Sequence, residues 1–275
     1  MTTSLVLEKQ GPVAIVTLNK PAKHNAFDDV LIAELTETLR SLEADDATRV
    51  VVLSAAGRSF SAGADLNWMR RMAGYSKEDN QNDSMHLAAL MRTLCFLRKP
   101  TIARVQGPAY GGGVGLVACC DVAVASHDAS FALSEAKLGL IPAVIAPYVV
   151  AAIGERSARR YFLTGERFPA SEAWRLGLVH ELAQDDGEID ERVGEIVDAM
   201  LACGPVAQRE AKDIIRAVAN RPITSELIQD TAERIARIRS SPEGREGVTS
   251  FLEKRRAAWL PPEPEVVEEE APPEL

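Results

Sequence analysis

Three short apolar runs, each about the length of one β-strand, constrain the fold of this 275-residue chain most strongly. They lie at residues 50–53, 102–105 and 122–125. Before the first and the second of them, residues 27–42 and 85–97 carry apolar side chains at helical spacing. Strands that read as nearly continuous apolar runs are buried on both faces, as in a largely parallel sheet covered by helices. The alternation therefore predicts an α/β fold.

The two ends of the chain add a hairpin and a helical region. Residues 5–9 and 13–18 are β-type runs on either side of Gln10-Gly11-Pro12, which predicts an N-terminal β-hairpin. From about residue 147 onward the pattern is almost wholly helical. The predicted organisation is an α/β core over residues 1–195 and a helical part over residues 196–260. The C-terminal helices expected from apolar spacing and end signals cover residues 170–176, 187–202, 206–218, 225–238 and 244–256.

The net charge is distributed unevenly along the chain. The formal net charge is −9, and residues 261–275 contain six glutamates, five prolines and no basic residue. We expect this segment to be an acidic, disordered tail. The rest of the chain carries a net charge of only −3. It lacks the basic excess of a nucleic-acid-binding protein, so we expect no nucleic-acid partner.

Cysteine and histidine residues form no metal-binding motif. The cysteines lack paired Cys-x-x-Cys spacing and the four histidines are scattered. We expect free thiols in a reducing cytoplasm, and no bound metal. No run of about 18 apolar residues occurs, so we expect no membrane span. We also expect no secretory signal from the first residues.

Two loops that follow predicted strands are rich in small residues. Residues 58–66 read Arg-Ser-Phe-Ser-Ala-Gly-Ala-Asp-Leu, and residues 106–116 contain three consecutive glycines, Gly111, Gly112 and Gly113. Small residues let a ligand approach the backbone closely. Exposed amides at a helix start can stabilise negative charge on an oxygen. An ordinary turn or close glycine packing would explain either loop alone, and the second loop matches neither a phosphate loop nor a GxGxxG fingerprint.

A third segment, residues 131–142, contains a single acidic residue among mostly apolar neighbours. This residue is Glu135. An apolar environment raises the pKa of a carboxyl group and suits it to proton transfer near neutral pH. The alternative is a surface glutamate that pairs with Lys137.

Together, these three segments resemble the enoyl-CoA hydratase/isomerase (crotonase) family in order and spacing. The matching motifs are Phe-Ser-Ala-Gly-Ala-Asp-Leu at 60–66, the glycine triplet, and Glu135 followed by Leu-Gly-Leu-Ile-Pro at 138–142. The resemblance extends to about residue 260. It implies a spiral core of repeated ββα units and a helical C-terminal part that forms trimers. It also implies an enzyme for acyl-coenzyme A thioesters, with CoA as part of the substrate and no separate cofactor.

The resemblance also implies roles for individual residues. The backbone N–H groups of Ala64 and Gly112 would form an oxyanion hole for the thioester carbonyl. Glu135 would exchange a proton with the substrate carbon or with an attacking water molecule. The residues that match substrate-binding positions are Lys23, His24, Ala62, Asp65, Leu66, Asn67, Gly115, Phe251 and Lys254.

Two departures from the family pattern bear on the reaction. Gly115 stands where the well-known hydratases have a first catalytic glutamate, and residues 143–148 are bulkier than the glycine run of many members. In these features the chain resembles the bacterial subgroup that acts on methylglutaconyl-CoA and isohexenylglutaconyl-CoA. We expect a cytoplasmic hydratase for an α,β-unsaturated acyl-CoA such as 3-methylglutaconyl-CoA. By the same resemblance we expect a homotrimer or a dimer of trimers.

Two other functions stay open at this point. Family isomerases that move a double bond between the Δ3 and Δ2 positions manage with one glutamate at the place of Glu135, so a Δ3,Δ2-enoyl-CoA isomerase is one alternative. A CoA- or RNA-binding scaffold without catalysis is the alternative of another class. Gly115 favours the scaffold, whereas Glu135 and the absence of a basic excess oppose it.

Overall fold

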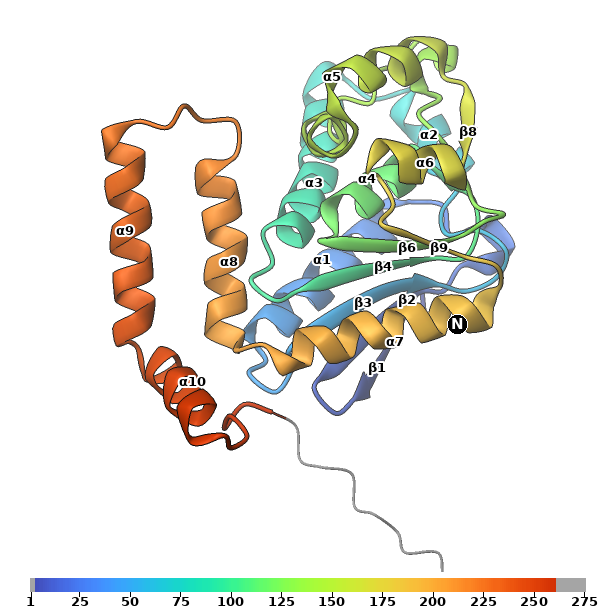
Figure 1. Cartoon of the computed structure of the whole chain (residues 1–275). Helices are drawn as coiled ribbons and strands as arrows, with labels where there is room; N and C mark the ends of the chain where they lie inside the picture. Colours follow the sequence, from blue (N-terminus) through green and yellow to red (C-terminus); the bar gives the residue numbers. More distant parts are fainter. Residues whose placement is uncertain (1–2, 261–275) are drawn as a thin grey trace, which may run out of the picture. The chain divides into compact units, whose positions relative to one another are not determined.

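A six-stranded sheet forms the centre of the first part of the chain (Figure 1), in a computed structural model that describes residues 3–260. The N-terminal hairpin is antiparallel, as predicted, and every later strand joins in parallel. The strands in spatial order are β1 (Leu5–Gln10), β2 (Val13–Leu18), β3 (Val50–Ala55), β4 (Thr101–Val105), β6 (Val122–Ser126) and β9 (Glu181–Ala183).

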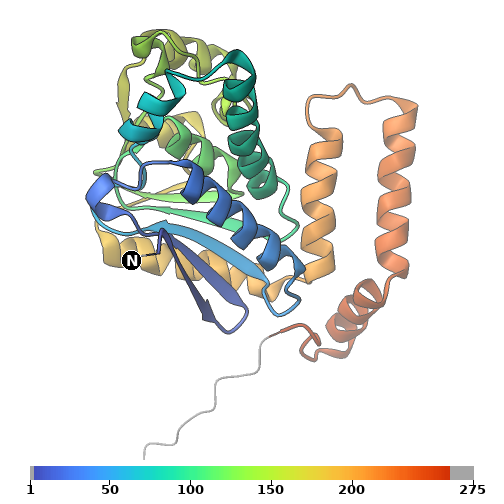
Figure 2. The same ribbon diagram turned by 180° about the vertical axis from the view of Figure 1, so that it is seen from behind.

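Helices cover both faces of this sheet, which explains why its central strands are so apolar. All six residues of β3 are buried. One face carries α1 (Asp29–Ala44), α3 (Lys77–Cys95) and α4 (Gly112–Cys119), and α7 (Asp186–Ala202) runs along the other (Figures 1 and 2). The α/β fold class predicted from the apolar runs is confirmed.

A second, three-stranded sheet was not predicted, and it positions the segment around Glu135. It consists of β5 (Ala109–Tyr110), β7 (Ser130–Ala132) and β8 (Arg167–Pro169). Strands β5 and β7 are parallel, with Tyr110 opposite Ala132. Because both strands run the same way, the residues that follow them emerge at the same edge.

The remaining elements of this part are short helices and one longer helix. They are η1 (Pro21–Lys23), α2 (Leu66–Met72), η2 (Glu135–Leu138), α5 (Ala146–Thr164) and α6 (Ala170–Leu176). Helix α5 is interrupted at Gly154, whose backbone φ is 74°. Helix α6 ends at Gly177 in the left-handed conformation, at the position predicted from sequence.

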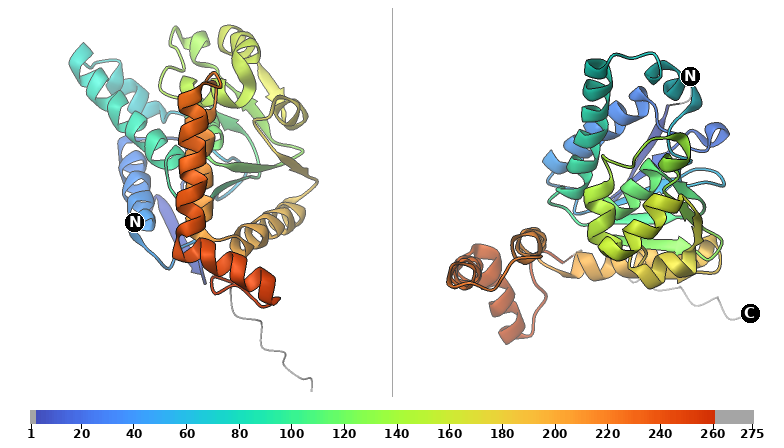
Figure 3. Two further views of the ribbon diagram at one scale, coloured as in Figure 1. Left: turned by 60° about the vertical axis from the view of Figure 1, so that its left-hand side comes forward. Right: turned by 90° about the horizontal axis from the view of Figure 1, so that it is seen from above.

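The chain divides into two compact units between Met200 and Leu201. The second unit contains α8 (Pro205–Val218), α9 (Ser225–Ser240) and α10 (Pro242–Glu253). Helices α8 and α9 lie side by side as an antiparallel pair (Figure 1), which is seen end-on in the right-hand view of Figure 3. The predicted acidic tail lies outside the described residues. Over the part of the chain that the structure describes, no helix is long and apolar enough to cross a membrane.

Candidate active site

Backbone hydrogen bonds on both sides of Ala64 determine the direction of its amide. Phe27 donates to the carbonyl oxygen of Gly63 at 2.7 Å, and Asp65 donates to the carbonyl oxygen of Phe27 at 2.7 Å. Ala64 lies between the two bonded residues, Gly63 and Asp65, of this parallel bridge. It therefore directs its own N–H group away from Phe27. Within residues 3–260 the Ala64 amide donates no hydrogen bond. Ala64 therefore presents a free N–H group on the side away from Phe27.

The other side of this loop packs against the loop that contains the glycine triplet. Ser61 donates to the carbonyl oxygen of Pro108 at 3.1 Å and accepts from the amide of Tyr110 at 2.8 Å. Gly63 has a φ of +86°, and a Cβ placed on it would lie 3.1 Å from the Tyr110 carbonyl oxygen and 3.9 Å from the Gly111 Cα. The two loops thus touch through their glycine backbones, which a larger residue would separate.

The second free amide comes from the start of α4. Gly112 is the first residue of this helix, Gly111 precedes it with a φ of 50°, and no side chain caps the helix. The first amides of a helix have no partner within it, and the Gly112 amide donates no hydrogen bond within the described part of the chain. The positive end of the helix dipole therefore faces the space beside Gly111.

The small sheet brings Glu135 to the same place. The amide of Gly111 donates to the carbonyl oxygen of Ala132 at 2.9 Å, three residues before Glu135. A Cβ placed on Gly111 would lie only 3.1 Å from Glu135 Oε1. The three segments singled out in the sequence therefore meet around Gly111, although they are far apart along the chain.

The Glu135 carboxyl lies in a poorly solvated environment. Burial raises its pKa above the ordinary value of 4.5. Its Oε2 atom is buried and has no hydrogen-bond partner among the described residues. The alternative of a surface pair with Lys137 is not realised, because that side chain packs against Gly165 instead, where a Cβ would lie 3.2 Å from Lys137 Cε. Glu135 is thus a carboxyl group with free hydrogen-bonding capacity and a tendency to hold a proton.

Lys23 and Asp65, both expected to bind the CoA moiety, bind each other. Lys23 Nζ lies 3.0 Å from Asp65 Oδ2, and Asp65 Oδ1 accepts from the amides of Asn67 and Trp68 at 2.9 and 3.1 Å. Burial opposes ionisation of Asp65, but these donors together lower its pKa. The carboxylate of Asp65 therefore serves as the N-cap of α2. Only the backbone of Asp65 is then available to contact a ligand.

The other predicted CoA contacts near this loop are accessible to different degrees. Ala62, Leu66 and Asn67 are exposed. His24 is half-buried, and its Nδ1 and Nε2 atoms lie 2.9 Å from Ser59 Oγ and 3.2 Å from Arg58 Nη2. This part of the site is polar on one side and apolar at Leu66.

Three predicted site residues remain, one in α4 and two in or next to α10. Gly115 is in the buried interior of α4, where it packs against Ile145. Phe251 and Lys254 belong to the second unit, in α10 and at its C-terminal cap.

Asn25 holds the first loop in place, and sequence reasoning missed this role. This residue is fully buried with a φ of 53°. Its side chain donates to the carbonyl oxygens of Ala56 and Ser59 at 2.9 and 2.8 Å and accepts from the amide of Lys20 at 2.8 Å. No sequence pattern marks an asparagine whose partners are up to 34 residues away.

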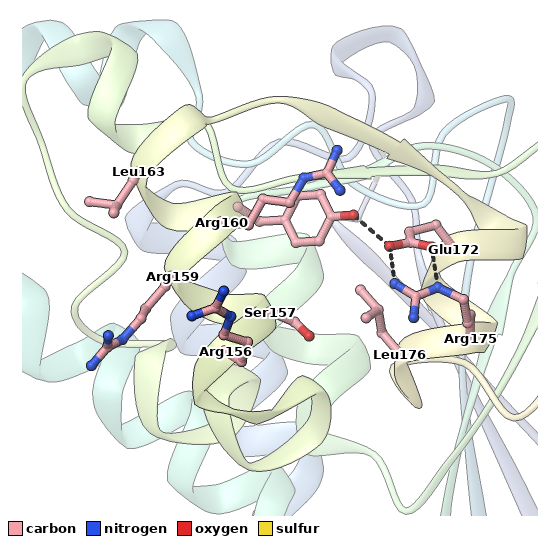
Figure 4. A pocket seen from close by; sticks show the side chains of 9 residues that line it. Arg156, Ser157, Arg159, Arg160, Leu163, Glu172, Arg175 and Leu176 are labelled. Atoms are coloured by element: carbon pink, nitrogen blue, oxygen red, sulfur yellow. Dashed lines mark hydrogen bonds and ion pairs between the residues drawn. The ribbon is translucent and has the colours of Figure 1, made fainter.

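Two cavities elsewhere in the first unit do not contain Glu135. One, of about 440 Å³, lies between α5 and α6 (Figure 4) and is lined by four arginines, three of which pair with glutamates, as Arg175 does with Glu172 at 2.6 Å. The other, of about 490 Å³, lies between the sheet and α7. Among residues 3–260 no cluster of His, Cys, Asp or Glu could hold a metal ion.

Comparison with known proteins identifies the family. The family model for enoyl-CoA hydratase/isomerase matches residues 8–261. The crystal structure of an enoyl-CoA hydratase from Shewanella pealeana superposes with a TM-score of 0.91 at 44% sequence identity, over 93% of this chain and 96% of that one. The 2,3-dehydroadipyl-CoA hydratase of Escherichia coli is 30% identical over 92% of this chain and 97% of its own length. The short-chain-enoyl-CoA hydratase of Clostridium acetobutylicum is 30% identical over 92% and 96%. The chain belongs to the enoyl-CoA hydratase/isomerase (crotonase) family and is an enzyme of the enoyl-CoA hydratase type.

Proposed function

We propose that this enzyme adds water across the α,β double bond of a branched enoyl-CoA that carries a second carboxylate, such as 3-methylglutaconyl-CoA. One observation carries the proposal: a single partly buried carboxyl group, Glu135, lies beside a helix start and a loop with free amides. The relative named for 2,3-dehydroadipyl-CoA acts, by that name, on an enoyl-CoA with a distal carboxylate.

The amides of Ala64 and Gly112 receive the thioester carbonyl oxygen in this mechanism. When the water oxygen bonds to the β-carbon, the electron pair of the double bond moves toward the carbonyl and negative charge develops on its oxygen. Donors that are already oriented stabilise this charge without reorganisation, and one such donor contributes about 3 kcal/mol to lowering the barrier.

Glu135 transfers the proton. Its ionised carboxylate takes a proton from water as the oxygen attacks the β-carbon, and the resulting acid delivers a proton to the α-carbon of the enolate. The sum is the addition of one water molecule, and Glu135 returns to its starting state. A pKa raised by burial makes the carboxylate a better base than an exposed glutamate.

The second carboxylate of the substrate compensates for the missing first glutamate in this proposal. Position 115 is a glycine and offers no polar side chain to orient the water. A carboxylate on the acyl group can accept a hydrogen bond from that water, which fixes its direction of attack.

The isomerase is the second candidate, and the single carboxyl group favours it. Movement of a double bond from the Δ3 to the Δ2 position needs one group that removes a proton from one carbon and returns it to another. Glu135 meets this requirement without any second carboxylate.

We further propose a homotrimer or a dimer of trimers in the cytoplasm, with no cofactor beyond the CoA part of the substrate. Large apolar side chains are exposed on all three helices of the second unit, among them Ile215, Ile228 and Phe251, which supports self-association. None of the cysteines in the described part of the chain is in a disulfide, which suits a reducing compartment.

Comparison of acyl-CoA substrates tests the function. We expect a higher kcat/KM for hydration of 3-methylglutaconyl-CoA than of crotonyl-CoA under the same conditions, and a preference for crotonyl-CoA would contradict the proposal. Incubation of a 3-enoyl-CoA in deuterated water separates the isomerase. Double-bond movement without water addition, and without hydration of any 2-enoyl-CoA, would establish the second candidate.

A further inference from the structure

Gly115 occupies a position where no side chain fits. It lies in the interior of α4, where glycine is less favourable than alanine. A Cβ placed on Gly115 would lie 2.3 Å from Ile145 Cγ2, 3.0 Å from Ile145 Cβ and 3.2 Å from Met91 Cε. Atoms do not approach this closely, so the glycine is required by its neighbour rather than by the helix.

Ile145 cannot easily move out of the way. It is 3% exposed and precedes the first residue of α5, and its carbonyl oxygen accepts from the amides of Tyr148 and Val149 at 3.1 and 3.0 Å. The two colliding atoms are its Cβ and the methyl group attached to it, which follow the backbone directly. A β-branched side chain also has few alternative rotamers.

This contact lies close to the carboxyl group of the site. The amide of Gly115 donates to the carbonyl oxygen of Gly111 at 3.2 Å, so the two residues are one helical turn apart. Gly111 is the residue whose Cβ would touch Glu135 Oε1. A polar side chain at position 115 would thus stand one helical turn from Gly111, the residue beside Glu135, in the space that Ile145 and the methyl group of Met91 now fill.

We infer that Ile145 is a specificity-determining residue: it excludes any side chain from position 115, restricts the site to one carboxyl group, and makes hydration depend on a carboxylate carried by the substrate. The inference rests on the proposed function, and it adds the residue that enforces the choice of acyl group. Gly115 and Ile145 are therefore coupled, and a substitution at either position alone should lower the stability of the folded protein.

A pair of double variants tests the effect on substrate choice. Gly115→Glu combined with Ile145→Ala removes the colliding methyl group and introduces a second carboxylate, and we expect the ratio of kcat/KM for crotonyl-CoA to that for 3-methylglutaconyl-CoA to rise about tenfold or more. Gly115→Gln with Ile145→Ala is the matched control without charge. Gly115→Glu with Ile145→Val is the steric control, because valine keeps the Cβ and the methyl group. Neither control should raise the ratio.

A double-mutant cycle of melting temperatures tests the steric contact between positions 115 and 145 without reference to any substrate. Gly115→Ala should lower the melting temperature by about 5 °C or more with Ile145 in place. The same change should cost at most about half as much in the Ile145→Ala background, because the 2.3 Å contact with Ile145 Cγ2 is then removed and only the 3.0 Å contact with Cβ and the 3.2 Å contact with Met91 Cε remain. Circular dichroism melting of the wild type, both single variants and the double variant gives the cycle.

The outcomes separate this inference from the proposed function. Equal melting penalties in the two backgrounds, an unchanged substrate ratio in a folded Gly115→Glu/Ile145→Ala protein, or failure of that protein to fold would each overturn the role of Ile145. If the wild type does not hydrate 3-methylglutaconyl-CoA, the proposed function fails, and with it the substrate part of the inference. The steric coupling of positions 115 and 145 would still be decided by the melting cycle.

Discussion

At the scale of single residues, Glu135 combines free hydrogen-bonding capacity with poor solvation. Its Oε2 atom is buried without a partner among the described residues, and burial raises the pKa of the carboxyl above 4.5. An ionised carboxylate in such a place is less stable than one in water. The same property that makes Glu135 a base therefore makes it a source of instability, and the two consequences can be measured separately.

Replacement of Glu135 by glutamine should abolish most of the catalysis. The amide keeps the size of the side chain but cannot accept and return a proton, so kcat should fall by about a hundredfold or more. In the wild type, kcat/KM should decrease on the acid side around a pKa above 4.5, since the carboxylate is the active form. Steady-state kinetics across pH provide the test, and a glutamine variant with unchanged turnover would remove Glu135 from the mechanism.

The same substitution should stabilise the folded protein at neutral pH. Because the folded-state pKa of Glu135 is raised, the carboxyl favours folding while it is protonated, and this advantage is lost as the pH rises through the folded pKa. Glu135→Gln carries no such dependence. Its melting temperature should exceed that of the wild type at pH 7.5, and the difference should disappear below pH 4.5. A difference that is constant with pH would contradict the environment described for this group.

At the scale of elements, the contact between α4 and the loop before α2 determines where the two free amides lie. A Cβ placed on Gly113 would lie 2.9 Å from both Ser61 Cβ and the Ser61 carbonyl oxygen. Ser61 belongs to the loop that carries Ala64. Any side chain at position 113 must therefore move the first turn of α4 away from that loop.

Gly113→Ala should lower both activity and stability. Overpacking of this kind costs about 1–3 kcal/mol, and displacement of one amide donor should reduce kcat/KM by about tenfold or more. The matched control is Gly194→Ala in α7, a helical glycine with no atom within 4 Å of the added Cβ. That variant should melt at a slightly higher temperature, because alanine favours a helix interior by up to about 1 kcal/mol. Identical behaviour of the two variants would show that the close contact between α4 and the loop of Ser61 does not depend on a glycine at position 113.

Local pattern predicted five of the six strands of the main sheet, but it missed β9 and all three strands of the small sheet. The central strand at residues 50–55 is apolar along its whole length, so its sequence alone indicates a buried strand. Strands β5 and β7 have two and three residues, and they exist because each pairs with a segment about 20 residues away. Helix α2 was also missed, whereas α6, which has the same length of seven residues, was predicted with the help of Gly177 at its end.

The site was predicted unevenly for a similar reason. Glycine-rich loops and a lone acid are visible in the sequence, and the resemblance to a family assigned Ala64, Gly112 and Glu135 their roles. The direction of the Ala64 amide depends on the hydrogen bonds of Phe27, and the requirement for Gly115 depends on Ile145, 30 positions later. Contacts between positions so far apart cannot be recognised from the local pattern of a single sequence.

At the scale of the whole molecule, the second unit leaves large apolar side chains uncovered. On α10, Val248, Phe251 and Leu252 are 58%, 81% and 72% exposed. Their spacing of three and four residues places them on one side of the helix. Apolar surface of this kind, concentrated on one side of a helix, is typical of an interface between subunits.

Introduction of a charge on this face of α10 should prevent self-association. Phe251→Asp places a carboxylate in an apolar interface, where it has no water and no counterion, so the variant should be monomeric while the wild type has a higher mass by light scattering after size exclusion. Phe251→Leu is the matched control, since it keeps an apolar side chain at the same exposed position of α10. It should keep the wild-type mass. A monomeric wild type would contradict the proposed trimer, and an assembled Phe251→Asp variant would place the interface on another face of the second unit.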